Sequence, residues 1–171
     1  MFGRDNTSKI WDRLETDVEN LSNKGKIILC GDFNARTGSL TDYITMDSNN
    51  NCYTLPESYQ FDYINDRMSM DTLIQKNGRR CVNICIENNL CILNGRTLGD
   101  LMGKYTCFPN KGCSVVDYYV CSHELKKNVT QMQVQDLTIY SDHCPIKLSI
   151  SLPLSKYQKK PLKHRYHSEK N

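Results

Sequence analysis

The sequence contains no long hydrophobic run. A membrane-spanning helix needs roughly 18 or more consecutive apolar residues, and no window of the 171-residue chain approaches that length. The first residues, MFGRDNTSKIW, also lack the apolar segment of a secretory signal peptide. These absences exclude a membrane-spanning segment and predict an intracellular protein.

The composition lacks the bias of a disordered chain. With 39% hydrophobic and 24% charged residues, it is typical of a soluble globular protein. A single domain of this length is expected to bury roughly 70% of its unfolded surface. The net charge of +3 is small, but residues 154–171 form a basic tail. We expect this tail to be disordered, and either merely solvated or a source of salt-sensitive affinity for phosphate backbones.

The cysteines lack the spacing of a structural zinc site. The chain has nine of them, an odd number, and Cys30, Cys85, Cys91 and Cys121 stand among Ile, Leu and Val. We therefore predict mostly reduced core residues rather than disulfides. Cys81 and Cys85 share a helix face, but no second pair follows at zinc-ligand spacing.

Hydrophobic periodicity predicts a helix followed by a strand at the start of the chain. Apolar residues recur at helical spacing over 10–21, with a cap expected within 6–8 and a stop at Gly25. The run KIILC at 26–30 is typical of a short strand buried on both faces. Residues 40–77 are polar and predict a long loop with one or two helical turns.

The second half predicts one more helix and several strands. Apolar residues over 82–90 predict the helix, which is capped by Asn77 and ends at Asn88 and Asn89, and the strand LCILN follows it. YTCFP and SVVDYYVC flank NKG and predict a hairpin, while VTQMQV and CPIKLSISL predict further strands. The fold class is therefore α/β, a mixed domain built around a sheet.

Polar residues interrupt or end the apolar strands at three places. These are Asp32 with Asn34 in GDFNARTG, Asp117 in SVVDYYVCS, and Asp142 with His143 in YSDHCPIKL. Side chains two apart on a strand point the same way, so Asp32 and Asn34 should face one place while Phe33 packs into the core. An acid within a buried strand needs a partner, and His143 is the candidate partner of Asp117.

These residue types suit the hydrolysis of a phosphate ester. A carboxylate that accepts a hydrogen bond from imidazole raises the imidazole pKa, which makes His143 a proton donor or a cationic brace. Asp142 is free to hold a hard divalent cation such as magnesium. Asp32 could orient or deprotonate water, and neutral Asn34 could donate to phosphoryl oxygens. A structural alternative remains, in which Asp32 and Asn34 cap a turn and Ser141 and Asp142 form a bend.

The motifs GDFNARTG, SVVDYYVCS and SDHCPIKLSI resemble, in type and order, those of the endonuclease/exonuclease/phosphatase superfamily. FGRDNTSKIWDRLETDVENLSNKGKIILCGDFNARTG and ENNLCILNGRTLGDLMGKYTC are similar to endonuclease domains of LINE-type retrotransposons and to their host relatives of the craniofacial development protein 2 type. The resemblance covers nearly all of residues 11–152. It implies the C-terminal half of a four-layer α/β/β/α sandwich of the DNase I-like class, formed by residues 1–153 and followed by the tail.

The resemblance also implies a magnesium- or manganese-dependent phosphodiester hydrolase that acts on DNA, with a nuclear location. Asp32 matches the acid that activates water, Asn34 the amide on the scissile phosphate, Asp117 the acid that orients histidine, His143 the histidine that stabilises the pentacoordinate phosphate, and Asp142 the metal-site acid. Inositol-phosphate phosphatases and sphingomyelinases share these motifs. The choice between DNA and another phosphate ester therefore stays open.

The chain departs from the family pattern in one respect. The pattern includes, upstream of the first helix, an asparagine-bearing strand, a metal-binding glutamate and a further tyrosine or histidine, none of which is matched here. We therefore expect weak metal binding and low or no activity of the chain alone. Half a sandwich leaves an apolar face bare, so we expect self-association or docking of an N-terminal half. The alternative function is a non-catalytic remnant that binds nucleic acid or another partner.

Overall fold

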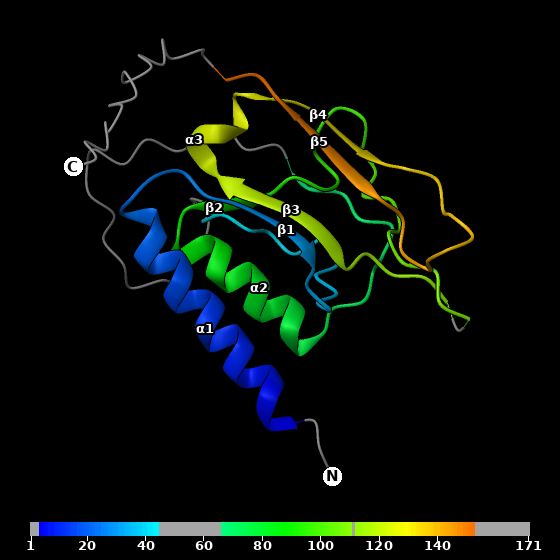
Figure 1. The fold of residues 1–171 in the computed structure, drawn as a ribbon, viewed down its shortest axis with the longest axis horizontal. Helices are drawn as coiled ribbons and strands as arrows, with labels where there is room; N and C mark the ends of the chain where they lie inside the picture. Colours follow the sequence, from blue (N-terminus) through cyan, green and yellow to red (C-terminus); the bar gives the residue numbers. More distant parts are fainter. Residues whose placement is uncertain (1–3, 45–65, 111, 153–171) are drawn as a thin grey trace, which may run out of the picture.

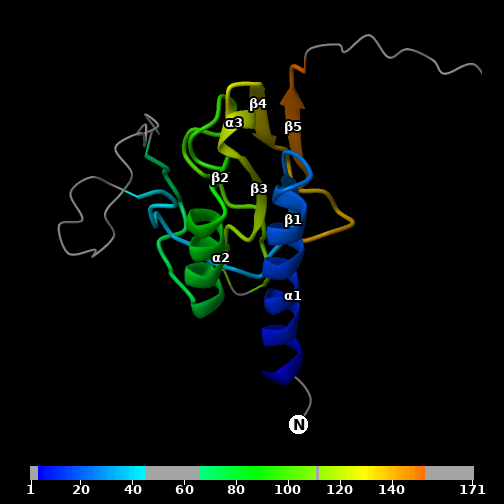
Figure 2. The same ribbon diagram turned by 90° about the vertical axis from the view of Figure 1, so that its left-hand side faces the viewer.

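The structure, a computed structural model, describes residues 4–44, 66–110 and 112–152. These residues form three layers: two helices, a three-stranded sheet, and a two-stranded sheet on its other side (Figures 1 and 2). Within these ranges no helix combines the length and hydropathy needed to cross a membrane. The predicted mixed α/β class is confirmed, whereas the described residues contain no fourth layer.

The helical layer consists of α1 (Arg4–Ser22) and α2 (Lys76–Glu87). Trp11 and Val18 of α1 are buried against the sheet and α2, which confirms the predicted amphipathic helix. Both helices begin earlier than their predicted caps, because residues 6–8 lie inside α1 and Asn77 lies in the first turn of α2. The cap predictions are therefore wrong, since side-chain cap preferences are weak beside the packing of a whole apolar face.

The central sheet has the order β1 (Ile28–Asp32), β3 (Asp117–Ser122), β2 (Leu90–Ile92), with both pairings antiparallel. Its helix-facing side supplies much of the main core, including the fully buried Tyr118 and Val120. The four-residue helix α3 (His123–Lys126) follows β3 directly. The sheet thus brings the end of β1 and the start of β3 to one edge of the molecule.

The two-stranded sheet is a hairpin of β4 (Val129–Val134) and β5 (Ile146–Ile150). Met132, which is fully buried, packs with Leu148 against Cys91 and Cys121 of the central sheet. The residues that alternate with this inner row are polar: Gln131, Gln133, Lys147 and Ser149. The hairpin therefore covers part of the bare face expected of a half sandwich and presents a polar face outward.

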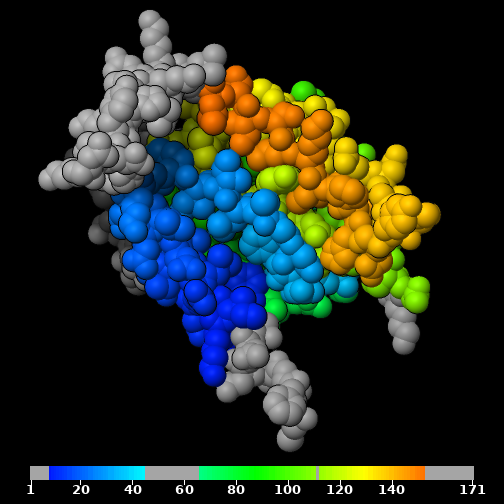
Figure 3. All heavy atoms as spheres, viewed as in Figure 1, coloured from blue at the N-terminus to red at the C-terminus, as the bar shows by residue number. Residues whose placement is uncertain are grey.

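The apolar sequence of β1 predicted a strand buried on both faces, but only one face is buried. Ile28 is 42% exposed and Cys30 is exposed, while Leu29 packs on the core side. The space-filling view shows atoms of the β3 region between the blue β1 and the orange β5, so the hairpin leaves the β1 side uncovered (Figure 3). β1 is an edge strand, and periodicity alone does not distinguish an edge from a centre.

The predicted loop over 40–77 contains buried charges in its described parts. Asp42 is 1% exposed and forms an ion pair with Arg96, while Arg67 donates hydrogen bonds to Thr37 Oγ1 (3.0 Å) and the Gly38 carbonyl oxygen (2.7 Å). Burial lowers the pKa of the Arg67 guanidinium, against the attraction of Asp42. The flanks of this segment are therefore anchored in the interior. Residues 40–44 and 66–75 contain none of the expected helical turns, and residues 45–65 lie outside the described residues.

The eight described cysteines are all free, as predicted. Cys85, Cys91 and Cys121 are buried, whereas Cys30 is exposed, because β1 lies at the sheet edge. The hairpin predicted around NKG is present only as a single bridge between Cys107 and Ser114. The basic tail predicted for 154–171 lies outside the described residues.

Candidate active site

Two carboxylates face one another across the central sheet. Asp32, the last residue of β1, is the register partner of Asp117, the first residue of β3. Register partners on antiparallel strands place their side chains on the same face, about 4.5–5.5 Å apart at Cβ. Like charges placed directly opposite destabilise a sheet by up to about 1 kcal/mol. A pair that lowers stability in this way is a candidate functional feature.

His143 joins this pair from the loop before β5. Its Nδ1 lies 2.9 and 3.1 Å from the two carboxylate oxygens of Asp117, so the predicted contact between the two residues is present. The hydrogen bond to Asp117 raises the pKa of His143, burial opposes it, and the negative charges of Asp117, Asp32 and Asp142 add to the rise. The site therefore favours an imidazolium that donates Nδ1–H to Asp117.

Buried polar groups that the sequence analysis did not single out fix the position of Asp117. Thr106 Oγ1 accepts hydrogen bonds from the backbone N–H groups of Val116 and Asp117, both at 3.1 Å. Asn94, which is fully buried, donates to the Asp117 carbonyl oxygen (3.0 Å) and accepts from Tyr119 N–H (3.1 Å). The sequence could have indicated Asn94, because it is a polar residue directly after the apolar strand LCIL. No comparable pattern marks Thr106.

Asn34 reaches the site by a different route from the one predicted. β1 ends at Asp32, and Asn34 has a φ of 46°, so strand alternation does not extend to it. Its backbone N–H instead donates to Asp32 Oδ1 at 2.8 Å, which is the turn geometry of the structural alternative. Phe33 packs against Trp11 and Tyr118 as expected. Asp32 and Asn34 nevertheless line the same cavity, of about 600 Å³, beside α1.

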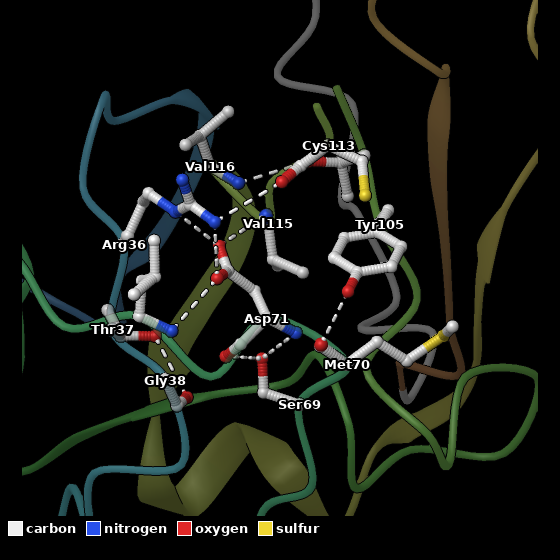
Figure 4. A network of polar contacts seen from close by, with 12 residues as sticks. Arg36, Thr37, Gly38, Ser69, Met70, Asp71, Tyr105, Cys113, Val115 and Val116 are labelled. Carbon is white, nitrogen blue, oxygen red and sulfur yellow. Dashed lines mark hydrogen bonds and ion pairs between the residues drawn. The ribbon is translucent and has the colours of Figure 1, made fainter. Parts of the chain in front are cut away.

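An ion pair holds the chain immediately after this turn. The guanidinium of Arg36 forms two hydrogen bonds of 2.7 Å with the two carboxylate oxygens of Asp71 (Figure 4). Asp71, which is 2% exposed, also accepts from the backbone N–H groups of Leu73 and Val115, both at 3.1 Å. Burial alone would raise the pKa of Asp71, but the hydrogen bonds from Arg36, Val115 and Leu73 outweigh it and lower the pKa. This network ties the turn to the segment that leads into β3.

The loop before β5 and the segment before β3 together carry the ligand groups of a candidate metal site. Cys107, Asp142 and His143 have ligand atoms that all lie within 4.8 Å of one another, and no other such group of three occurs in the described part of the chain. Magnesium, which the resemblance implies, takes oxygen ligands, often one or two carboxylates with several waters. Asp142 fits this need with one exposed carboxylate. The sulfur and nitrogen of its neighbours do not.

A second cavity, of about 450 Å³, lies beside the loop that bears Asp142 and His143. Tyr105, Phe108, Leu137 and Cys144 are among its lining residues. The aromatic rings of Tyr105 and Phe108 meet edge to face, with centroids 6.2 Å apart. The loop that bears two of the predicted site residues therefore also borders an apolar, partly aromatic depression.

Comparison with models of protein families gives a match over most of the chain. A sequence model of a family described as endonuclease-reverse transcriptase matches residues 2–147. The matched range runs from α1 into β5 and includes all five residues predicted for the site. A search of curated proteins found no match.

Proposed function

Because the chain belongs to the endonuclease-reverse transcriptase family, we propose that it is a magnesium-dependent phosphodiester hydrolase of the DNA endonuclease type, of LINE retrotransposon origin. The observation that carries the proposal is the contact of His143 with Asp117, which lies directly opposite Asp32 on the neighbouring strand. An acid, a histidine held by a second acid, and a third acid nearby are the groups that phosphodiester hydrolysis requires. A nuclear location is part of the same proposal.

In this proposal Asp32 accepts a proton from the attacking water. Its carboxylate is exposed and accepts one hydrogen bond, from the backbone of Asn34, which leaves further lone pairs for water. The side-chain amide of Asn34, in the same cavity, donates to a non-bridging phosphoryl oxygen. Asp142 supplies the carboxylate for magnesium, and the bound ion would offset negative charge that develops on the phosphate.

His143 stabilises the same charge from the other side. With Nδ1–H donated to Asp117, the imidazolium presents Nε2–H as its second donor. Cys107 Sγ lies 3.3 Å from Nε2 in the free protein, so a phosphate oxygen competes with this thiol for the donor. Because its pKa is raised, His143 stays charged up to a higher pH than a free imidazole does.

A partner fits the uncovered side of the central sheet. Among the described residues no strand pairs with the outer edge of β1, and its side chains Ile28 and Cys30 are exposed. Both features support docking of an N-terminal half domain or of a second copy of the chain. Such docking would complete the four-layer sandwich. The second candidate function is a non-catalytic remnant that binds nucleic acid, and the Asx turn that already engages Asp32 favours it.

The deciding experiment is nicking of supercoiled plasmid by the purified chain with and without magnesium. We expect magnesium-dependent nicking that falls at least about 100-fold in Asp142→Ala and in His143→Ala, as is usual for acid–base and charge-stabilising groups. Asp136→Ala, another exposed acid in the same loop, is the matched control and should nick normally. Equal nicking by all three variants, or none by a folded wild-type chain that still binds DNA at low salt, would leave the remnant as the function.

A further inference from the structure

The loop before β5 and the segment before β3 place a thiol, an imidazole and a carboxylate together. Cys107 is 7% exposed, His143 is partly buried, and Asp142 is exposed, so the group opens toward solvent through one member. Cys107 and His143 are partners in an antiparallel bridge. This mixture of sulfur, nitrogen and oxygen is the ligand set of a zinc site rather than of a magnesium site.

Backbone hydrogen bonds hold the three groups in place. Phe108 N–H donates to the Asp142 carbonyl oxygen and Cys144 N–H to the Thr106 carbonyl oxygen, both at 2.7 Å. These bonds lie on either side of the bridge and fix the backbone of the cysteine and the histidine. The backbone positions of the ligands are therefore set by the fold before any ion arrives, which reduces the backbone entropy lost on binding.

The separation of the two strongest ligand atoms matches a single zinc ion. Zinc lies about 2.3 Å from a thiolate sulfur and about 2.0–2.1 Å from an imidazole nitrogen, so a tetrahedral angle places those two atoms about 3.5 Å apart. Cys107 Sγ and His143 Nε2 are 3.3 Å apart. A hydrogen bond alone also permits this distance, but the Asp142 carboxylate lies within 4.8 Å of both atoms and is available as a third ligand.

The remaining ring nitrogen of the histidine is also positioned as in a zinc site. Metal-ligating histidines usually donate their other N–H to a carboxylate or a carbonyl oxygen. His143 has this partner, because its Nδ1 lies 2.9 Å from Asp117 Oδ2. The contact fixes Nε2 as the atom available to a metal.

We propose that Cys107, Asp142 and His143 bind a zinc ion, with water in the fourth position, and that this ion competes with phosphate for His143. On binding, the thiol releases a proton to solvent and its thiolate joins the metal. The imidazolium releases its Nε2 proton to solvent as well and binds through the freed nitrogen, while the Asp142 carboxylate binds as it is. Zinc would then hold the site closed to the DNA chemistry proposed above. Zinc binding itself does not depend on that chemistry.

Cobalt(II) titration in the absence of DNA tests the proposal, because cobalt reports thiolate ligation by a near-ultraviolet charge-transfer band. We expect a band in the wild-type chain that zinc abolishes by displacement. It should be lost in Cys107→Ser and retained in Cys30→Ser, which removes an exposed thiol elsewhere on the surface. Asp142→Asn should weaken cobalt binding at least about tenfold.

Circular dichroism establishes that each variant is folded. Should Cys107→Ser fail to fold, Asp142→Asn carries the test, because that side chain is exposed. No charge-transfer band in the wild-type chain, or a band of equal strength in Cys107→Ser, would overturn the proposal. Equal cobalt affinity of wild type and Asp142→Asn would do the same. A chain that never nicks DNA can still pass or fail this test, so the two proposals are judged separately.

Discussion

Replacing Asp71 by Asn should weaken the fold substantially, although Asp71 is not a predicted catalytic residue. The substitution keeps the shape of the side chain but removes its charge and one of its two acceptor oxygens. Both oxygens are in use, since each accepts one bond from Arg36 at 2.7 Å and one from a backbone N–H group at 3.1 Å. The new amide NH₂ group is itself a donor, and it would face the donors of Arg36 and of the backbone in the place of the second oxygen.

The magnitude follows from the burial of the two partners. Breaking a fully buried ion pair costs about 3–5 kcal/mol, because one charge stays buried without a partner. The side chain of Arg36 is 22% exposed, so water solvates part of the abandoned guanidinium. We therefore expect a loss of about 2–3 kcal/mol for Asp71→Asn. For a chain of this length that corresponds to a fall in Tm of about 4–12 °C.

Thermal unfolding followed by circular dichroism measures the effect. The matched control is Asp12→Asn, which breaks the exposed ion pair with Arg80 and should cost less than about 1 kcal/mol. The Asp71 carboxyl has a lowered pKa in the folded state, so its contribution is complete above about pH 4, its unfolded pKa, and is lost as pH falls through the folded value. Equal Tm values for both variants at pH 7, or a difference that persists in strong acid, would refute the reasoning.

Two further substitutions test packing and charge. Gly78→Ala should cost about 3 kcal/mol, because a Cβ there would meet the Arg36 carbonyl oxygen at 1.8 Å. Its unfolding midpoint in urea should fall well below that of the control Gly25→Ala, where a Cβ would have no atom within 4 Å. Equal midpoints would contradict this prediction. The pKa of His143 is raised in the folded state, so its pairing with Asp117 stabilises fully below about pH 6.5 and is lost as pH rises through the folded value. The Tm difference between wild type and His143→Asn should therefore shrink from pH 5 to pH 9, and a difference that grows with pH would count against the assignment.

Local patterns predicted most of the elements and one contact of the site. The apolar spacing that ends at Leu21 predicted α1, and the cost of burying Asp117 without a partner predicted its contact with His143. Both inferences rest on physics that acts over a few residues or on a single buried charge.

The parts that sequence reasoning missed depend on which distant segments meet. Arg36 and Asp71 are 35 residues apart, and no local feature of either indicates the other. The apolar run of β1 predicted burial on both faces, but burial of Cys30 requires a neighbouring layer that the described residues do not contain. The turn at Asn34 replaced strand alternation, because Asp32 accepts a hydrogen bond from its backbone.

The opposed carboxylates of Asp32 and Asp117 have a consequence for engineering this protein. Their repulsion means that neutralising Asp32, for example by Asp32→Asn, removes an unfavourable interaction from the folded state, whereas Asp117 is held by its bond with His143. A library of variants selected only for expression or heat resistance would therefore accumulate substitutions at this edge of the sheet. Such a selection would improve the fold while removing the proposed chemistry, so any stabilised form must be selected with these two acids held fixed.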